Sequence, residues 1–169
     1  MATSVNPVSV LEVGFGTGLN AWLTLQQAEK LQRNTYYETI ELYPINETTA
    51  HELSDDEIFR SLHSAPWEQP VEITSYFVLH KRKCDLMKTM FNNKYDVVFF
   101  DAFSPAVQPE MWNSDIFTKL YSSMNSSAIL TTYCAKGSVR RTMQDAGFIV
   151  ERLPGPTGKR EMLRAIKNG

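Results

Sequence analysis

The chain has 169 residues, of which 43% are hydrophobic and 21% charged, a composition typical of one water-soluble globular domain. The formal net charge of −2 argues against indiscriminate binding to nucleic acid. No apolar run approaches the length of a membrane span and no signal-like segment opens the chain, which predicts a cytoplasmic protein without membrane contact. Cys84 and Cys134 lack the spacing of metal ligands, which predicts reduced thiols and no metal site.

The first predicted elements are a strand, a glycine-rich turn and a helix. Val8–Val13 is a short apolar run rich in β-branched residues, typical of a buried parallel strand. Gly14, Gly16 and Gly18 follow, and a helical pattern then continues to about Arg33. In this layout, backbone amides at a helix N-terminus meet a nucleotide-like ligand, and glycines let it approach where a Cβ would collide.

The spacing of these glycines distinguishes between nucleotide ligands. A dinucleotide fingerprint reads G-x-G-x-x-G, but here the third glycine comes one residue early and Leu19 occupies its place. Glu12 lies two residues before the first glycine, where a negative charge would repel a pyrophosphate but suits an amino group and a sulfonium. The pattern E-V-G-x-G-x-G resembles motif I of the class I S-adenosylmethionine (SAM) methyltransferases. The alternative is an ordinary tight strand–helix turn of an α/β protein.

Acidic residues follow the next two predicted strands, Thr35–Leu42 and Val71–Leu79. Glu41 lies roughly twenty residues past the glycine turn, where an acid binds ribose hydroxyls in Rossmann-like sites. The alternative is an acid at a strand end in solvent. Asp85 either caps a helix over Leu86–Phe91 or lies near the adenine amino group, as the resemblance to class I methyltransferases implies.

Asp101 follows the strand predicted to be central. Tyr95–Phe100 is an almost uninterrupted apolar run, which indicates a strand buried on both faces. Ligands of open α/β sheets lie beyond the carboxyl ends of the strands, so Asp101 is predicted to face the same crevice as the glycine turn. Before this strand, two short helices are predicted over Ile45–Leu53 and Asp55–His63, the second with Ser54 as its N-cap.

The last third of the chain is predicted to continue the alternation of helices and strands. The predicted elements are a helix over Pro109–Met124, a strand over Ala128–Tyr133, a helix over Gly137–Ala146 ending at Gly147, and strands over Phe148–Leu153 and Glu161–Ile166. The last two strands would form an antiparallel pair at one sheet edge. The predicted fold class is α/β: a Rossmann-like class I methyltransferase fold in one domain over residues 1–169. Its mostly parallel seven-stranded sheet has an antiparallel edge strand and helices on both faces.

Charge is distributed unevenly along the chain. From Glu41 to Glu72 there are eight acidic residues against one basic residue, whereas from Cys134 to Gly169 there are eight basic residues against three acidic ones. A polarised chain of this kind can present a basic face to phosphates while remaining acidic as a whole. Two ordinary solvated surfaces would give the same counts.

Several further stretches resemble one family, the tRNA 5-aminomethyl-2-thiouridine methyltransferases. Asp101-Ala102-Phe103-Ser104-Pro105 with Gln108-Pro109-Glu110-Met111-Trp112 resembles its D-[GA]-F-[AS]-P…N-P-E-M-W block. The other matching stretches are 136–141, 146–148 and 158–163, so the resemblance spans Ser9 to Ala165. Members usually have a segment before the glycine motif, and many are fused to a flavin-dependent oxidase. The expectation is therefore a stand-alone, N-terminally shortened methyltransferase domain without a fused oxidase.

The resemblance implies a SAM-dependent enzyme that methylates the amine of 5-aminomethyl-2-thiouridine at the wobble position of tRNA, with the anticodon region as its partner. The residues expected to bind SAM are Glu12, Gly14, Gly16, Glu41 and Asp85. Asp101 would bind, aim and deprotonate the amine, in a pocket shaped by Phe103, Ser104 and Pro105. The candidates for contacting tRNA phosphates are Lys136, Arg140, Arg141, Lys159 and Arg160. Two alternatives remain: a SAM-dependent methyl- or aminopropyltransferase acting on a small amine, and a catalytically silent SAM-fold module that binds tRNA or a protein.

Overall fold

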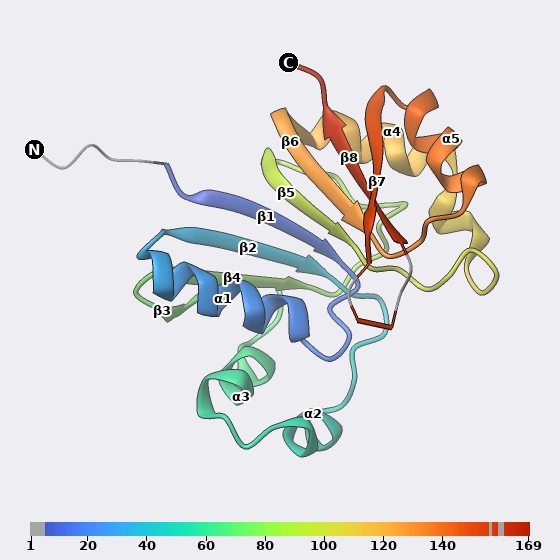
Figure 1. Ribbon diagram of the computed structural model, residues 1–169. Coiled ribbons are helices and arrows are strands. Elements are labelled where there is room, and N and C mark those ends of the chain that lie inside the picture. Colours follow the sequence, from blue (N-terminus) through green and yellow to red (C-terminus); the bar gives the residue numbers. More distant parts are fainter. Residues whose placement is uncertain (1–5, 156, 159–160) are drawn as a thin grey trace, which may run out of the picture.

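An eight-stranded sheet forms the centre of the molecule, with the strand order β3-β4-β2-β1-β5-β6-β8-β7 (Figure 1). The computed structural model describes residues 6–155, 157–158 and 161–169, so Lys159 and Arg160 lie outside the described residues. The strands are β1 (Val8–Val13), β2 (Thr35–Ile40), β3 (Pro70–Thr74), β4 (Phe77–Arg82), β5 (Tyr95–Phe100), β6 (Met124–Thr132), β7 (Phe148–Pro154) and β8 (Glu161–Lys167). The helices are α1 (Leu19–Leu31), α2 (Glu47–Leu53), α3 (Glu57–Ser64), the 3₁₀ helix η1 (Pro109–Trp112), α4 (Ser114–Ser123) and α5 (Gly137–Asp145).

Five neighbouring strands of this sheet, β4, β2, β1, β5 and β6, are parallel. The predicted antiparallel pair is confirmed, because β8 runs antiparallel to β7 and also to β6. At the centre, β1 pairs with β5, which lies far along the chain, and the Ser9 N–H donates to Asp96 Oδ2 at 2.9 Å. The mostly parallel Rossmann-like architecture is therefore as predicted, with eight strands in place of seven.

The additional strand comes from the stretch predicted as one strand over Val71–Leu79. The chain turns at Ser75–Tyr76, so β3 folds back and pairs antiparallel with β4. The apolar alternation continues across this turn, and Ser-Tyr is not one of the dipeptides that mark a hairpin. The alternation of apolar residues therefore gave no indication that the chain reverses direction at Ser75–Tyr76.

The helix predicted over Leu86–Phe91 is absent. The Asp85 carbonyl accepts hydrogen bonds from the N–H groups of Lys88 and Thr89, and after this single turn the chain runs irregularly to β5. Asp85 Oδ1 accepts from the Met87 N–H at 2.9 Å, an Asx turn rather than a helix cap. The capping role considered for Asp85 is therefore wrong.

Two other boundaries differ from the prediction. The N-cap of α3 is Asp56 rather than Ser54, because Asp56 Oδ1 accepts from the Phe59 N–H at 2.7 Å. The helix predicted over Pro109–Met124 divides into η1 and α4, because Asn113 is extended and its side chain caps α4. Both differences arise from side-chain oxygens that compete for backbone amides.

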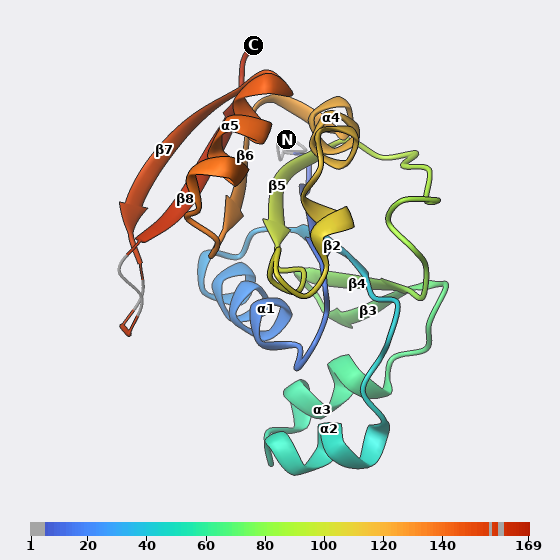
Figure 2. The same ribbon diagram turned by 90° about the vertical axis from the view of Figure 1, so that its right-hand side faces the viewer.

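Helices lie on both faces of the sheet (Figure 2). An apolar cluster on each face holds them in place. Because successive strand residues point to opposite faces, Val10 joins the cluster under α1 and α3, whereas Leu11 joins the one under α4 and α5. Helices therefore cover both faces, as predicted. None of the described helices combines the length and apolarity needed to cross a bilayer. Cys84 and Cys134 are free thiols, as expected.

Candidate active site

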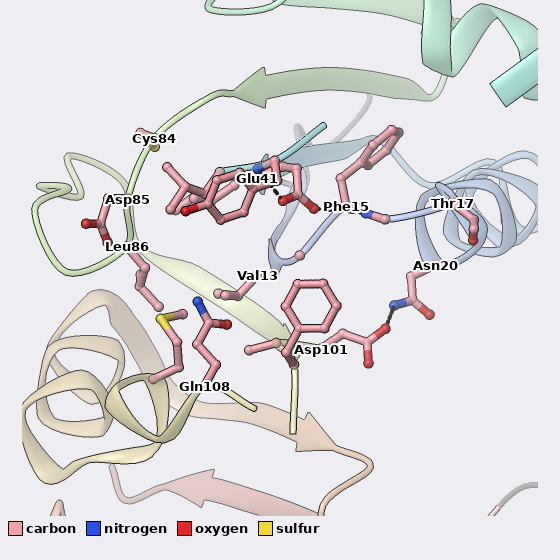
Figure 3. A pocket seen from close by; sticks show the side chains of 18 of the residues that line it. Val13, Phe15, Thr17, Asn20, Glu41, Cys84, Asp85, Leu86, Asp101 and Gln108 are labelled. Carbon is pink, nitrogen blue, oxygen red and sulfur yellow. Dashed lines mark hydrogen bonds between the residues drawn. The ribbon is translucent and has the colours of Figure 1, made fainter. Parts of the chain in front are cut away.

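A cavity of about 240 Å³ lies beyond the carboxyl ends of β1, β2 and β5 (Figure 3). This is the position at which open α/β sheets bind ligands, because the connections on either side of the central strand leave toward opposite faces. The predicted site residues that line it are Gly14, Gly16, Glu41, Asp85, Asp101 and Phe103. The sequence therefore identified this wall from residues that lie far apart along the chain.

The glycine turn shapes one side of the cavity, and its three glycines have positive φ angles. A Cβ on Gly14 would lie 2.8 Å from the Asp101 carbonyl oxygen, so β1 and β5 end in contact that only glycine permits. A Cβ on Gly16 would meet no atom within 4 Å, although Gly16 lines the cavity. The space beside Gly16 is therefore available to a ligand.

This difference gives a prediction for two matched variants. Gly16→Ala is expected to weaken SAM binding at least tenfold while costing roughly 1–2 kcal/mol of stability, the usual cost of a left-handed alanine. Gly14→Ala is expected to destabilise the fold more, because its methyl group overlaps the backbone of Asp101. Calorimetry with S-adenosylhomocysteine and thermal unfolding measure the two effects. Unchanged affinity in a folded Gly16→Ala protein would exclude close ligand contact at this turn.

Glu41 connects the glycine turn to the loop after β2. Its Oε2 accepts from the Gly16 N–H at 3.2 Å, and its Oε1 accepts from the Tyr43 N–H at 2.9 Å. A carboxylate has about four lone-pair sites, so both oxygens keep capacity for ribose hydroxyls. Glu41 is thus fixed by the backbone at the rim of the cavity, as a ribose-binding acid requires.

Asp85 lies across the cavity from the glycine turn, beside Cys84 and Leu86 (Figure 3). Its side chain is half-buried, and its Oδ1 accepts from the Met87 N–H. Leu86 is buried and supplies an apolar wall next to it. An acceptor beside an apolar wall suits the amino edge and flat face of an adenine.

Asp101 is exposed at the end of β5, and its side chain meets Asn20 of α1 (Figure 3). Asn20 Nδ2 donates to Asp101 Oδ2 at 3.4 Å. The turn that follows is held by two bonds to backbone oxygens: Tyr133 Oη donates to Ala102 at 2.8 Å, and Trp112 Nε1 donates to Phe103 at 2.8 Å. Asp101 is therefore an accessible carboxylate on a firmly supported turn.

Of the three residues predicted to shape the substrate pocket, only Phe103 lines the cavity, and its side chain is 63% exposed. The Ser104 carbonyl accepts from the N–H groups of Val107 and Gln108. Ser104 and Pro105 lie in this turn and do not line the cavity.

Glu12 is the predicted SAM ligand that the structure does not bring to the cavity. It is 1% exposed, points to the same face of β1 as Val10, and does not line the cavity. Thr39 Oγ1 donates to its Oε2 at 2.8 Å. Burial raises the pKa of Glu12 to about 8, although hydrogen bonding from Thr39 opposes the shift, so the carboxyl group is mostly uncharged at neutral pH.

Three of the basic residues predicted to contact tRNA are described by the structure, and these three do not line the cavity. Lys136 caps α5, which carries Arg140 and Arg141. Lys136 and Arg141 are exposed, whereas Arg140 is half-buried and its Nε is buried without a hydrogen-bond partner among the described residues.

Sequence reasoning missed other residues of the cavity wall, among them Asn20, Tyr43, Gln108 and Met111. Asn20 follows the last glycine by two residues, so its place in the first turn of α1 was a usable signal. Gln108 and Met111 were noted only as part of a matching block. Tyr43 lies beyond the strand end and gave no separate signal.

A comparison with known families identifies the class of enzyme. A family model described as S-adenosyl-L-methionine-dependent methyltransferase matches residues 59–168, more than half of the chain. The chain belongs to this family. Its cofactor is therefore SAM rather than NAD, in agreement with the spacing of the glycines.

Four similar curated proteins share the name tRNA 5-methylaminomethyl-2-thiouridine biosynthesis bifunctional protein MnmC. The one from Pseudomonas paraeruginosa is 30% identical over 94% of this chain and 27% of its own length. The one from Campylobacter hominis is 28% identical over 97% of this chain and 26% of its own length. The chain thus spans about a quarter of the length of these relatives.

Solved structures confirm the fold of this SAM methyltransferase. MnmC2 from Aquifex aeolicus has a TM-score of 0.75 at 23% identity, over 95% of this chain and 53% of the other. SAM-bound CalS10, an amino pentose methyltransferase from Micromonospora echinaspora, has a TM-score of 0.61 at 11% identity, over 96% of this chain and 84% of the other. At these identities the likeness concerns the fold alone.

The cavity suits SAM in this methyltransferase. The open space beside Gly16, the carboxylate of Glu41 and the apolar wall at Leu86 could receive the methionine part, the ribose and the adenine. When bound, SAM supplies an activated methyl group on a sulfonium. The chain's own residues then have to bind the acceptor, align it and manage its proton.

Proposed function

We propose that this methyltransferase transfers the methyl group of SAM to the amine of 5-aminomethyl-2-thiouridine at the wobble position of tRNA. The observation that carries the proposal is the alignment of nearly the whole chain with proteins named for 5-methylaminomethyl-2-thiouridine biosynthesis. The position of Asp101 supports it, because an alkyl amine needs a carboxylate beside the methyl donor. As tRNA is the substrate, the protein would act in the cytoplasm.

Asp101 has the properties that this reaction needs. An alkyl amine is mostly an ammonium ion at neutral pH and has no free lone pair. The exposed carboxylate of Asp101 can bind the ammonium, direct it toward the cavity and accept its proton. The nitrogen lone pair then forms the new N–C bond as the S–C bond breaks and its electron pair returns to sulfur.

The mouth of the cavity suits a nucleobase carried by a large molecule. Phe103 and Tyr43 line it with side chains that are 63% and 71% exposed. Exposed aromatic rings of this kind stack unpaired bases of RNA loops. A dedicated site for a small free amine would be expected to enclose its substrate.

The test is methyl transfer from radiolabelled SAM to purified tRNA. We expect labelling of tRNA that bears the aminomethyl group, and none of tRNA in which that group is already methylated. Labelling of small amines with no tRNA labelling would favour the small-amine alternative. SAM binding without any transfer would favour a silent binding module.

We further predict that tRNA binding depends on the basic C-terminal third. Arg140→Ala/Arg141→Ala, and separately Lys159→Ala/Arg160→Ala, should weaken tRNA binding and lower the slope of log Kd against log salt by about 1–2. Filter binding over a salt series measures this slope. Lys30→Ala, at the far end of α1 from the cavity, is the matched control. If both double variants bind tRNA with the affinity of the parent protein, the basic C-terminal third is a solvated surface without a role in tRNA binding.

A further inference from the structure

A short segment after β4 forms the wall of the cavity across from the glycine turn, and it is neither helix nor strand (Figure 3). Asp85 supplies the carboxylate of this wall, and Leu86 supplies its buried apolar part. A segment without the hydrogen bonds of a helix or a sheet needs other partners to stay in one place. The contacts that hold this segment therefore decide where the Asp85 carboxylate lies.

Lys119 of α4 connects this segment to the body of the domain. Its Nζ donates to the carbonyl oxygen of Leu86 at 2.8 Å and to that of Met87 at 3.0 Å. Asp115 lies one turn earlier on α4 and would be the ordinary partner of a surface lysine, but within the described part of the chain no ion pair joins the two. Hydrogen bonds from a charged donor are about twice as strong as neutral ones. The two carbonyls are thus held by a strong donor.

Hydrogen bonds through Met87 connect Lys119 to the carboxylate of Asp85. The Met87 carbonyl accepts from Lys119, and the N–H of the same residue donates to Asp85 Oδ1 at 2.9 Å. The Met87 side chain is exposed, and it lines a separate cavity of about 330 Å³ together with residues 113–119 of α4 and its N-cap. Side-chain packing therefore does little to fix Met87 against α4, and the bond from Lys119 does this instead.

We propose that Lys119 is a positioning residue for the base of SAM: it holds Met87, and through it Asp85, so that the Asp85 carboxylate accepts from the amino group of the adenine. The inference goes beyond the proposed function, because it concerns the cofactor rather than the acceptor. Asp85 keeps capacity for this bond, since a carboxylate has about four lone-pair sites and Met87 occupies one of them. Lys119 acts through Asp85 and does not itself line the cavity.

This arrangement predicts selectivity for an amino group over an oxygen at the edge of the base. Hypoxanthine presents an oxygen where adenine presents its amino group. An oxygen that faces the Asp85 carboxylate leaves both groups without a donor, and the half-buried position of Asp85 limits compensation by water. A displaced carboxylate would lose this selectivity, because hydrogen bonds weaken steeply with distance and angle.

The test compares binding of S-adenosylhomocysteine with that of S-inosylhomocysteine, which carries the oxygen, by calorimetry on the whole chain. The parent is expected to prefer S-adenosylhomocysteine at least about tenfold. Lys119→Met keeps a good helix former but removes the donors, so the preference should fall to about threefold or less while S-inosylhomocysteine binds as in the parent. Lys119→Arg, which can donate to both carbonyls, should retain the preference.

Lys94→Met is the matched control. Lys94 also donates to a backbone carbonyl of α4, that of Ser122, but it lies at the other end of the irregular segment, directly before β5. This variant should keep the parental preference. An equal loss in both methionine variants would show a general loosening of the segment and would overturn the proposal. A parent protein without any preference would overturn it as well.

Two further measurements test the connection itself. In an Asp85→Ala background, Lys119→Met should change the preference no further, because both substitutions act on one carboxylate; additive losses would overturn the proposal. In ¹⁵N NMR of the parent, which requires no variant to fold, the Met87 amide and Lys119 ammonium signals should shift more with S-adenosylhomocysteine than with S-inosylhomocysteine. Equal shifts would overturn the proposal. None of these measurements involves methyl transfer or tRNA, so failure of the proposed function remains a separate result.

Discussion

Replacing Asp101 with asparagine is expected to lower methyl transfer to aminomethyl tRNA by roughly 10²–10⁴-fold, the range for loss of a general base. Asparagine keeps the size of the side chain but can neither pair with an ammonium ion nor take its proton. The Asp101 N–H would still donate to the Val13 carbonyl, so the end of β5 should remain in place. Single-turnover transfer from labelled SAM to tRNA measures the loss.

Two controls make this result specific. Binding of S-adenosylhomocysteine should be retained by Asp101→Asn, because the proposed ligand contacts lie at Gly16, Glu41 and Leu86. Glu110→Gln removes an exposed carboxylate nearby that does not line the cavity, and it should transfer methyl at the parental rate. If Asp101→Asn also keeps that rate, Asp101 only ends the strand and another group takes the proton.

Glu12→Gln is expected to stabilise the protein at neutral pH by on the order of 3 kcal/mol. The pKa of Glu12 is raised to about 8 in the folded protein and is 4.5 for an ordinary glutamate. Between these values the unfolded chain releases a proton that the folded protein retains. The contribution of Glu12 to stability is therefore full below about pH 4.5 and declines by about 1.4 kcal/mol per pH unit up to about pH 8.

Urea unfolding of both proteins at pH 5, 7 and 8.5 measures this effect. The difference in free energy of unfolding between Glu12→Gln and the parent should grow with pH and level off above about pH 8. Other groups titrate alike in both proteins and cancel in the difference. Glu72→Gln, on the exposed face of β3, is the matched control for loss of a strand carboxylate. A difference that does not change with pH would mean that Glu12 is ionised in the folded protein.

The residues that could be predicted are those whose position follows from local pattern. The succession of an apolar strand, a glycine turn and a helix predicts the positions of Gly14 and Gly16. An acid at the end of a strand lies at the ligand-binding edge of the sheet, wherever that strand lies in the sheet. Glu41 and Asp101 were identified in this way. The direction of Glu12 could not be, because it depends on which face of β1 is covered by α1.

The irregular segment before β5 was missed for a different reason. Lys119 on α4 donates to the carbonyl oxygens of Leu86 and Met87, at 2.8 and 3.0 Å. At the other end, Asn93 donates to the buried carboxylate of Glu38 on β2. These partners lie about 30 and 55 residues away along the chain. A helical pattern over residues 86–91 contains no information about such distant competitors.

The pairing of β1 with β5 has a consequence for the order in which this protein folds. The Ser9–Asp96 hydrogen bond closes a separation of 87 residues, and contacts of such long range form late because loop closure costs entropy. Gly14 directly follows β1 and Asp101 directly follows β5, and both residues line the cavity. A chain still emerging from the ribosome therefore lacks a complete cofactor site until β5 has been made and has docked. Cofactor binding then stabilises the assembled domain as a whole rather than any part of it.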